Sequence, residues 1–180
     1  MDPLPSLVAS PGMPFDAVVA ASEISVPPPA SSGDVGYTAP AGPHVWVLRI
    51  GDRDLVFPGS RFTTLEIGAG RVARIRCVPV LEYISPGAAA ELGGLLRGRL
   101  REAGFTEVDE VEPHVIEERL PAEGEVRACR FRAGEWMGEV RVTRAIEAAS
   151  EAGKSLSLGE DACLVSCTIW DVRGAAALIG

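Results

Sequence analysis

The chain has 180 residues, 47% of them hydrophobic, which suffices for one domain with a core but not for two. Its formal net charge is −8, and Lys154 is the only lysine among 17 basic residues. Nucleic acid and anionic lipid attract concentrated basic patches, and the sequence shows none, so non-specific binding to either is disfavoured. We find no long apolar run and no basic segment before an apolar one, so we expect a soluble or peripheral protein without a membrane span or secretory signal. The compartment stays open.

The composition changes near residue 44. Residues 1–44 hold nine of the 14 prolines and four acidic residues, with no lysine or arginine. Proline-rich stretches such as SVPPPASSGDVGYTAPAGP favour polyproline II and loops, which bury too little apolar surface to fold alone. We therefore expect a long irregular arm over 1–44, either a disordered linker or a strap on a partner protein, beside one α/β domain over 45–180. The partner-binding side chains of a strap would be Phe15, Val18, Val19, Ile24 and Tyr37.

The domain begins with a predicted hairpin. HVWVLRI (44–50) has the β-branched and aromatic content of a strand, GDRD is rich in turn formers, and LVF follows before Pro58. Among the tryptophans, Trp46 and Trp170 lie inside predicted strands and are expected to be buried. Trp136 lies beside a predicted turn and is expected to be more exposed.

A further strand is predicted in RVARIRCVPVLEY (71–83). Ala73, Ile75 and Cys77 alternate with Arg74 and Arg76, so the apolar and charged side chains lie on opposite faces of a half-buried strand. Proline cannot donate to a strand ladder, so the proline of this segment, Pro79, indicates an edge strand or a bulge.

An amphipathic helix is predicted over 85–104, SPGAAAELGGLLRGRLREAG. Ser85 is a good N-cap, the next residue is proline, leucines recur at helical spacing, and Gly104 fits the C-terminal cap. Each glycine inside a helix costs about 1 kcal/mol relative to alanine. Gly93, Gly94 and Gly98 therefore indicate a close approach of the helix to a sheet, or a broken helix.

The broken form resembles a segment of PDZ domains. SPGAAAELGGLLRGRL (85–100) is similar to their pattern S-P-x-x-A-A-x-x-G-x-L-x-x-G-D, with Arg99 in place of the final Asp. The carboxylate-binding G-L-G-F loop of those domains has only IGAG (67–70) as a counterpart here. The resemblance implies a peptide-binding module as an alternative function.

The order of elements gives a longer resemblance. After the helix come EVDEVEPHVIEERL, EVRACRFRAGEW, GEVRVTRAIEAA and DACLVSCTIWDV, which we interpret as three or four successive antiparallel strands. The order resembles the PsbP-like and DcrB-like α/β sandwich superfamily over roughly residues 45–172. This implies an α+β fold in which an antiparallel β-sheet packs against one or two helices.

The same resemblance implies a mostly non-catalytic role. Members of that superfamily are extrinsic photosystem subunits, assembly factors, envelope lipoproteins or secretion chaperones. We therefore expect a non-enzymatic accessory subunit without a cofactor, which docks through its N-terminal arm onto a larger protein complex such as a photosystem.

AASEAGKS (148–155) matches the phosphate-loop pattern and gives a second alternative, a nucleotide-binding enzyme. In such a loop Gly153 would allow close approach of the backbone, Lys154 would bind the phosphate charge and Ser155 would bind magnesium. The following SLSLGEDACLVSC is not an amphipathic helix, and Glu147 would repel phosphate. A loop between antiparallel strands explains the segment better.

The four cysteines are expected to be small packed side chains. On a strand, Cys163 and Cys167 share one face roughly 13 Å apart and cannot bridge each other. A cross-strand disulfide that involves Cys77 or Cys129 stays open.

Catalytic and metal sites are not predicted. The only histidines, His44 and His114, lie in no recognisable nucleophile setting and are too few for a zinc site. The acidic residues over 107–118 alternate with valines, which is typical of a solvated face.

Overall fold

The computed structural model describes residues 3–32, 35–51, 53–60, 62–79, 84–108, 126–144 and 163–173. Within them, β-strands dominate, and two helices complete a sheet-dominated α+β fold, as the sequence predicts. The helices are α1 (Phe15–Ala21) and α2 (Pro86–Glu102). The strands are β1 (Ser6–Val8), β2 (Ala30–Ser32), β3 (Val35–Thr38), β4 (His44–Ile50), β5 (Arg53–Ser60), β6 (Phe62–Gly68), β7 (Arg71–Val78), β8 (Thr106–Glu107), β9 (Val126–Ala133), β10 (Trp136–Arg144) and β11 (Cys163–Asp171).

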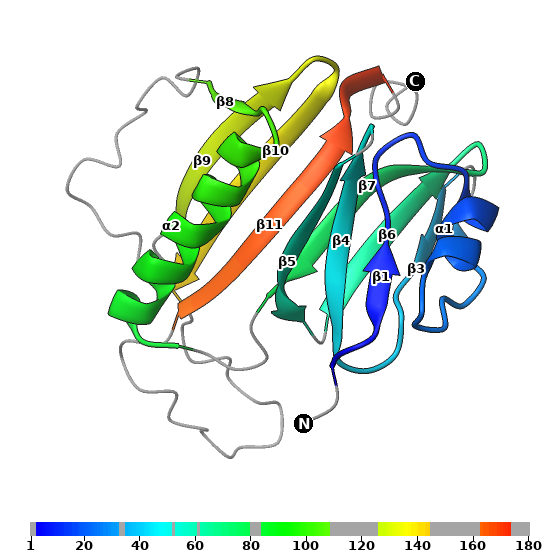
Figure 1. Cartoon of the computed structure of the whole chain (residues 1–180), viewed down its shortest axis with the longest axis horizontal. Helices are drawn as coiled ribbons and strands as arrows, with labels where there is room; N and C mark the ends of the chain where they lie inside the picture. The colour runs from blue at the N-terminus through cyan, green and yellow to red at the C-terminus, as the bar shows by residue number, and fades with distance from the viewer. Residues whose placement is uncertain are drawn as a thin grey trace.

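The strands form two sheets. The larger is antiparallel throughout, in the order β2-β3-β6-β7-β11-β10-β9-β8, and the smaller has the order β1-β4-β5. In Figure 1, α2 lies in front of β9 and β10 and beside β11, while the smaller sheet lies in front of β6 and β7. Buried side chains from all these elements join in one core. One face of the large sheet is therefore covered by a helix along one half and by the smaller sheet along the other.

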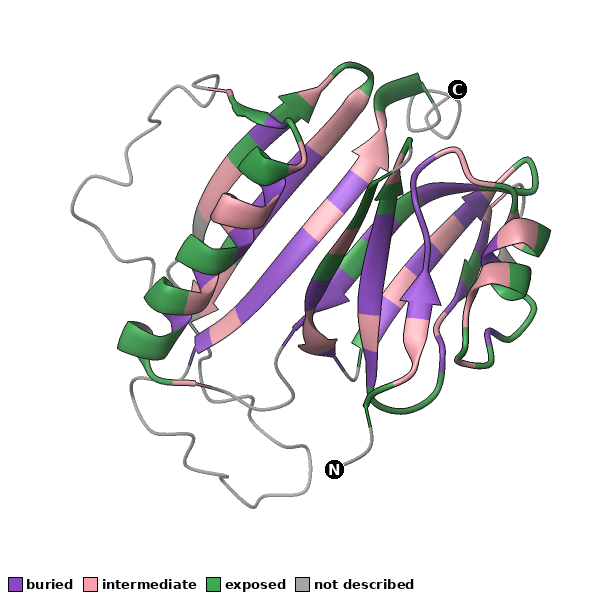
Figure 2. Cartoon of the chain, viewed as in Figure 1, coloured by how far each residue is buried: buried purple, intermediate pink, exposed green. Residues whose placement is uncertain are grey.

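The two halves of this core have different centres. Under the smaller sheet, the rings of Trp46 and Phe57 stack at a centroid distance of 4.3 Å. Under α2, Leu96 and Leu100 are fully buried with Phe131. Along β11 the buried residues Cys163, Val165, Cys167 and Ile169 alternate with others on the second face, of which Ser166 is also buried. Figure 2 shows the resulting run of buried residues in the middle of the strand.

The tryptophan expectation is confirmed only in part. Trp46 is fully buried, but Trp136 and Trp170 are both half-buried, so the expected contrast between these two is wrong. Trp136 begins β10 and packs against the core, whereas Trp170 lies on the other face of β11 from the buried Ile169.

Two hairpin turns explain short motifs of the sequence. β4 and β5 form the predicted hairpin, with a bidentate ion pair between Arg49 and Asp54 at 2.8 and 3.0 Å. IGAG comprises the end of β6 and the two-residue turn to β7, in which Ala69 and Gly70 both have positive φ. Pro79 follows the last residue of β7, a central strand between β6 and β11, so the expected edge or bulge there is wrong. The proline ends the strand.

Helix α2 is continuous. The Ser85 hydroxyl accepts a hydrogen bond from the Ala88 N–H, as expected of the N-cap. Of the three glycines only Gly93 is buried, and a Cβ atom there would lie 3.6 Å from Val142. Gly94 and Gly98 have open space where a Cβ atom would lie. Gly93 alone faces the sheet, but a Cβ atom there would make only an ordinary van der Waals contact. The approach to the sheet therefore requires none of the three glycines, and the broken helix is wrong.

Gly94→Ala is expected to raise the free energy of unfolding by about 0.5–1 kcal/mol, because alanine restricts the unfolded chain and meets no atom in the folded one. Urea denaturation measures this as a higher midpoint with an unchanged slope. Gly93→Ala is the comparison, with a gain at least as large, because its methyl group would also be buried in ordinary van der Waals contact with Val142. A loss of stability in Gly94→Ala would contradict an open helix surface.

The N-terminal segment packs on its own chain, unlike the irregular arm that its composition predicts. β1 pairs in parallel with β4, and β3 pairs with β6 inside the large sheet. Leu7 and Val18 are fully buried in the common core, and Val26 is nearly so. The composition changes at residue 44, but strands from before and after this residue pair with each other.

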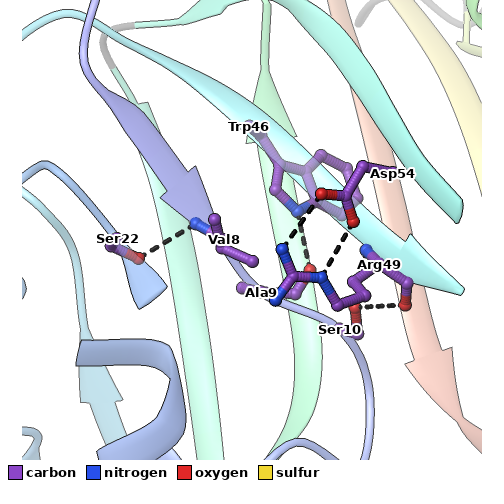
Figure 3. A network of polar contacts seen from close by, with 7 residues as sticks. All are labelled: Val8, Ala9, Ser10, Ser22, Trp46, Arg49 and Asp54. Carbon is purple, nitrogen blue, oxygen red and sulfur yellow. Dashed lines mark hydrogen bonds and ion pairs between the residues drawn. The ribbon is translucent and has the colours of Figure 1, made fainter. Parts of the chain in front are cut away.

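Hydrogen bonds fix this segment in place, as Figure 3 shows. The Trp46 indole donates to the Ala9 carbonyl at 3.0 Å, and the Ser10 hydroxyl donates to the Arg49 carbonyl at 2.7 Å. The Val8 N–H donates to the Ser22 hydroxyl at 2.9 Å. The prolines are compatible with this packing because they lie outside the strands, for example Pro14 directly before α1. Composition alone does not reveal that short elements lie between them.

Candidate functional site

The face of the large sheet opposite α2 and the smaller sheet carries a group of arginine, glutamate, hydroxyl and aromatic side chains. Along each strand these side chains alternate with the core residues, and we call this surface the outer face. It comprises Tyr37, Phe62, Thr64, Glu66, Arg74, Arg76, Ala128, Arg130, Arg132, Met137, Glu139, Arg141, Thr143, Leu164, Ser166, Thr168 and Trp170.

Strand register brings the arginines together. Arg76 on β7 lies opposite Thr168 on β11, and Arg141 on β10 lies opposite Ser166. Arg74 lies opposite Trp170. Thr168 and Trp170 therefore have guanidinium groups beside them on β7, and Ser166 has one beside it on β10.

The outer face is positively charged on an acidic protein. Its five arginines and two glutamates leave a charge of +3, while the whole chain has −8. The expectation that no concentrated basic patch exists is therefore wrong. The arginines are scattered along the sequence, and only strand pairing places β7 and β9 in one sheet.

Two partly buried carboxylates order these arginines. Glu139 accepts from Arg141 at 2.8 Å and from Arg130 at 3.3 Å, and Glu66 lies 3.5 Å from Arg74. The glutamate side chains are only 10% and 12% exposed, whereas the three arginines are 45–47% exposed. The negative charges thus lie beneath guanidinium groups that face solvent.

A hollow of about 290 Å³ lies at the centre of the outer face. It is lined by Arg74, Arg76, Glu139, Arg141, Ser166, Thr168 and Trp170. Guanidinium N–H groups and hydroxyl groups are donors, and an indole offers an apolar surface. This combination suits an anionic group on an organic carrier.

The predicted phosphate-loop residues Gly153, Lys154 and Ser155 lie outside the described residues, as does His114. His44 is fully buried, with Nδ1 2.9 Å from the Gly42 carbonyl and Nε2 2.8 Å from the Thr63 hydroxyl. Its environment is that of a packed, hydrogen-bonded histidine. The described residues hold no group of three or more His, Cys, Asp or Glu side chains placed to bind a metal ion.

The residues proposed for partner binding divide into two groups. Val18 is buried, and Phe15 and Ile24 are half-buried against the chain's own core. Val19 and Tyr37 are 43% and 47% exposed. Tyr37 lies opposite Glu66 and thus belongs to the outer face.

Cys163 and Cys167 lie buried on the core face of β11, as the strand spacing predicts. Cys167 lies opposite Cys77, and all four cysteines are free thiols. Burial raises the pKa of Cys77 to about 11, although hydrogen bonds with Ser60 and Thr63 act in the other direction. Burial, and secondarily the nearby Cys77, raise the pKa of Cys167 well above the ordinary value of 9.0.

Stability is expected to fall as the pH rises from about 9 to about 11, because the unfolded chain ionises its Cys77 thiol while the folded chain keeps it protonated. Below pH 9 both states are protonated and this contribution is fully present. Urea denaturation of the wild type and Cys77→Ala across this range measures it, with a shallower pH dependence expected in the variant. Identical pH dependences would contradict the raised pKa.

Comparisons with protein-family models, curated proteins and solved structures found no significant match. The helices in the described ranges are too short or too polar to cross a membrane. The resemblance to the PsbP-like superfamily and the resemblance to PDZ domains therefore stay predictions.

Proposed function

We propose that the protein is a non-enzymatic interaction subunit that binds an acidic segment of a partner protein on its outer face. The observation that carries this proposal is the +3 charge gathered on one sheet face of a chain with net charge −8. Guanidinium groups bind carboxylates through paired hydrogen bonds. Arginine, tryptophan and tyrosine are also the side chains that dominate binding energy at protein interfaces, and the outer face holds all three.

An acidic protein segment fits better than an extended polyanion. Nucleic acid gains affinity by placing many phosphates against basic groups along its length. Beyond the outer face it would meet a chain whose remaining charge is strongly negative. A short acidic segment contacts only the basic surface, and at physiological ionic strength charges more than about 8 Å away are screened.

The docking surface differs from the one that the N-terminal composition predicts. Val18 is buried in the core of its own chain, so it is not available to a partner. Tyr37 is exposed on the outer face and stays a partner-binding residue. Membership of a larger complex, such as a photosystem, remains a prediction from the PsbP-like resemblance.

Charge reversal on the outer face tests this function. A short fluorescent peptide rich in Asp and Glu is titrated with the protein, and anisotropy measures the dissociation constant. Arg76→Glu combined with Arg132→Glu is expected to weaken binding by at least about tenfold, since like charges across an interface cost several kcal/mol. Added salt is expected to weaken wild-type binding.

The matched control is a double variant with the same change in net charge, placed outside the outer face. Arg53 lies on β5 in the smaller sheet and Arg99 lies on α2, so neither belongs to the outer face. Arg53→Glu combined with Arg99→Glu is expected to change the dissociation constant by less than about threefold. Equal losses in both double variants, or no binding by the wild type, would refute the outer face as the docking surface.

A further inference from the structure

We infer that the central hollow of the outer face is a subsite for a phosphorylated side chain of the acidic partner. This inference rests on the proposed function and specifies the group that the partner presents. Three features carry it: the placement of the donors, the local charge, and the fixed position of one guanidinium group.

The donors surround the hollow from two sides. Arg74 and Arg76 come from β7, Arg141 comes from β10, and Ser166 and Thr168 lie between them on β11. Adjacent strands lie about 4.8 Å apart, so β7 and β10 are separated by about twice that distance. A phosphate group offers three terminal oxygens that accept from both sides at once, whereas a carboxylate offers two oxygens in one plane.

The local charge matches a dianion. Three arginines and Glu139 line the hollow, which leaves a charge of +2. A phosphomonoester carries about −1.5 to −2 at pH 7, while an Asp or Glu side chain carries only one negative charge. The hollow is thus better neutralised by a phosphorylated side chain than by a carboxylate.

Glu139 holds the Arg141 guanidinium group in position before a ligand binds. Nε and Nη2 of Arg141 lie 3.0 and 2.8 Å from its carboxylate, and Nε of Arg130 lies 3.3 Å from the other oxygen. An arginine has five N–H donors, so Arg141 keeps donors for a ligand while its position is fixed. A fixed donor loses less entropy when the ligand binds. Trp170 adds an apolar wall for the carrier of the phosphate.

Three peptides of one acidic sequence test the subsite, with phosphoserine, glutamate or serine at the central position. The wild type is expected to bind the phosphoserine peptide about tenfold more tightly than the glutamate peptide, a difference of about 1.4 kcal/mol. Arg76→Gln is expected to reduce this preference to about twofold or less, and Arg74→Gln serves as a second variant. Thermal melting confirms that each variant is folded.

Arg132→Gln is the matched control, because Arg132 lies on the outer face outside the hollow and its Nε donates to the Gly134 carbonyl. This variant is expected to weaken the binding of all three peptides to the same extent and to leave the preference for the phosphoserine peptide unchanged. Equal wild-type affinities for the phosphoserine and glutamate peptides would refute the subsite while the proposed function stands. Binding of none of the peptides would refute both. A single-stranded oligonucleotide that binds more tightly than the phosphoserine peptide would also overturn the inference.

Discussion

Deletion of residues 1–28 is expected to abolish the cooperative unfolding transition, although this segment has the composition of a linker. It removes β1, α1 and the buried side chains Leu7, Val18 and Val26. Burial of each Leu or Val contributes about 1.5–3 kcal/mol, and a domain of this kind has a total stability of about 5–15 kcal/mol. The stabilisation lost with these three side chains is therefore comparable with the total free energy of unfolding. Thermal melting followed by circular dichroism measures it.

Two neighbouring valines of α1 test whether the N-terminal segment contributes to the stability of the domain. Val18 is fully buried and Val19 is 43% exposed. Val18→Asp buries a charge without a partner and is expected to destabilise by at least about 3 kcal/mol, whereas Val19→Asp is expected to stay within about 0.5 kcal/mol. Equal, small effects of both substitutions, with a truncated chain that still melts cooperatively, would show that the segment is a passive appendage.

Trp46→Ala is expected to destabilise the protein by about 3–5 kcal/mol, the range for removal of a large buried aromatic side chain. Trp46 is fully buried, stacks on Phe57 and donates to the Ala9 carbonyl. The substitution removes the ring from between the smaller sheet and the large sheet, and it removes one of the hydrogen bonds that hold the N-terminal segment. Urea denaturation gives the change in the free energy of unfolding.

Trp46→Phe separates these two contributions. Phenylalanine retains an aromatic ring next to Phe57 but has no N–H for the Ala9 carbonyl. An unsatisfied buried acceptor costs about 1–3 kcal/mol, so this variant is expected to fall between the wild type and Trp46→Ala. A cost below about 1 kcal/mol for Trp46→Ala would mean that the ring does not join the two sheets.

Local features of the sequence predicted much of the fold. Alternation predicted β7 because residues two apart on a strand share a face, and β-branched and aromatic content predicted β4. Ser85 marked the start of α2 because its hydroxyl satisfies a free N–H. The Cys163 and Cys167 positions followed from the same spacing. These features depend on neighbouring residues and are therefore readable along the chain.

The sequence predicted only part of the outer face. Alternation placed Arg74 and Arg76 together on the exposed side of one strand, and that much was predicted. Their proximity to Arg141 depends on β11 lying between β7 and β10 with one particular register, and a shift by one residue would turn Arg141 to the other face. Register across strands far apart in sequence depends on burial summed over the whole sheet.

The sequence by itself determined the α+β class, the strands β7, β9, β10 and β11 of the large sheet, helix α2 and the packed state of the cysteines. Only the tertiary structure decided that residues 6–8 pair with β4 and that the outer face gathers arginines around Trp170. The physical reason is the same in both cases. A three-residue strand has little local preference, and a surface composed of several strands has no single segment to mark it. Both exist because distant segments bury their apolar sides together and leave the alternate side chains on one common face.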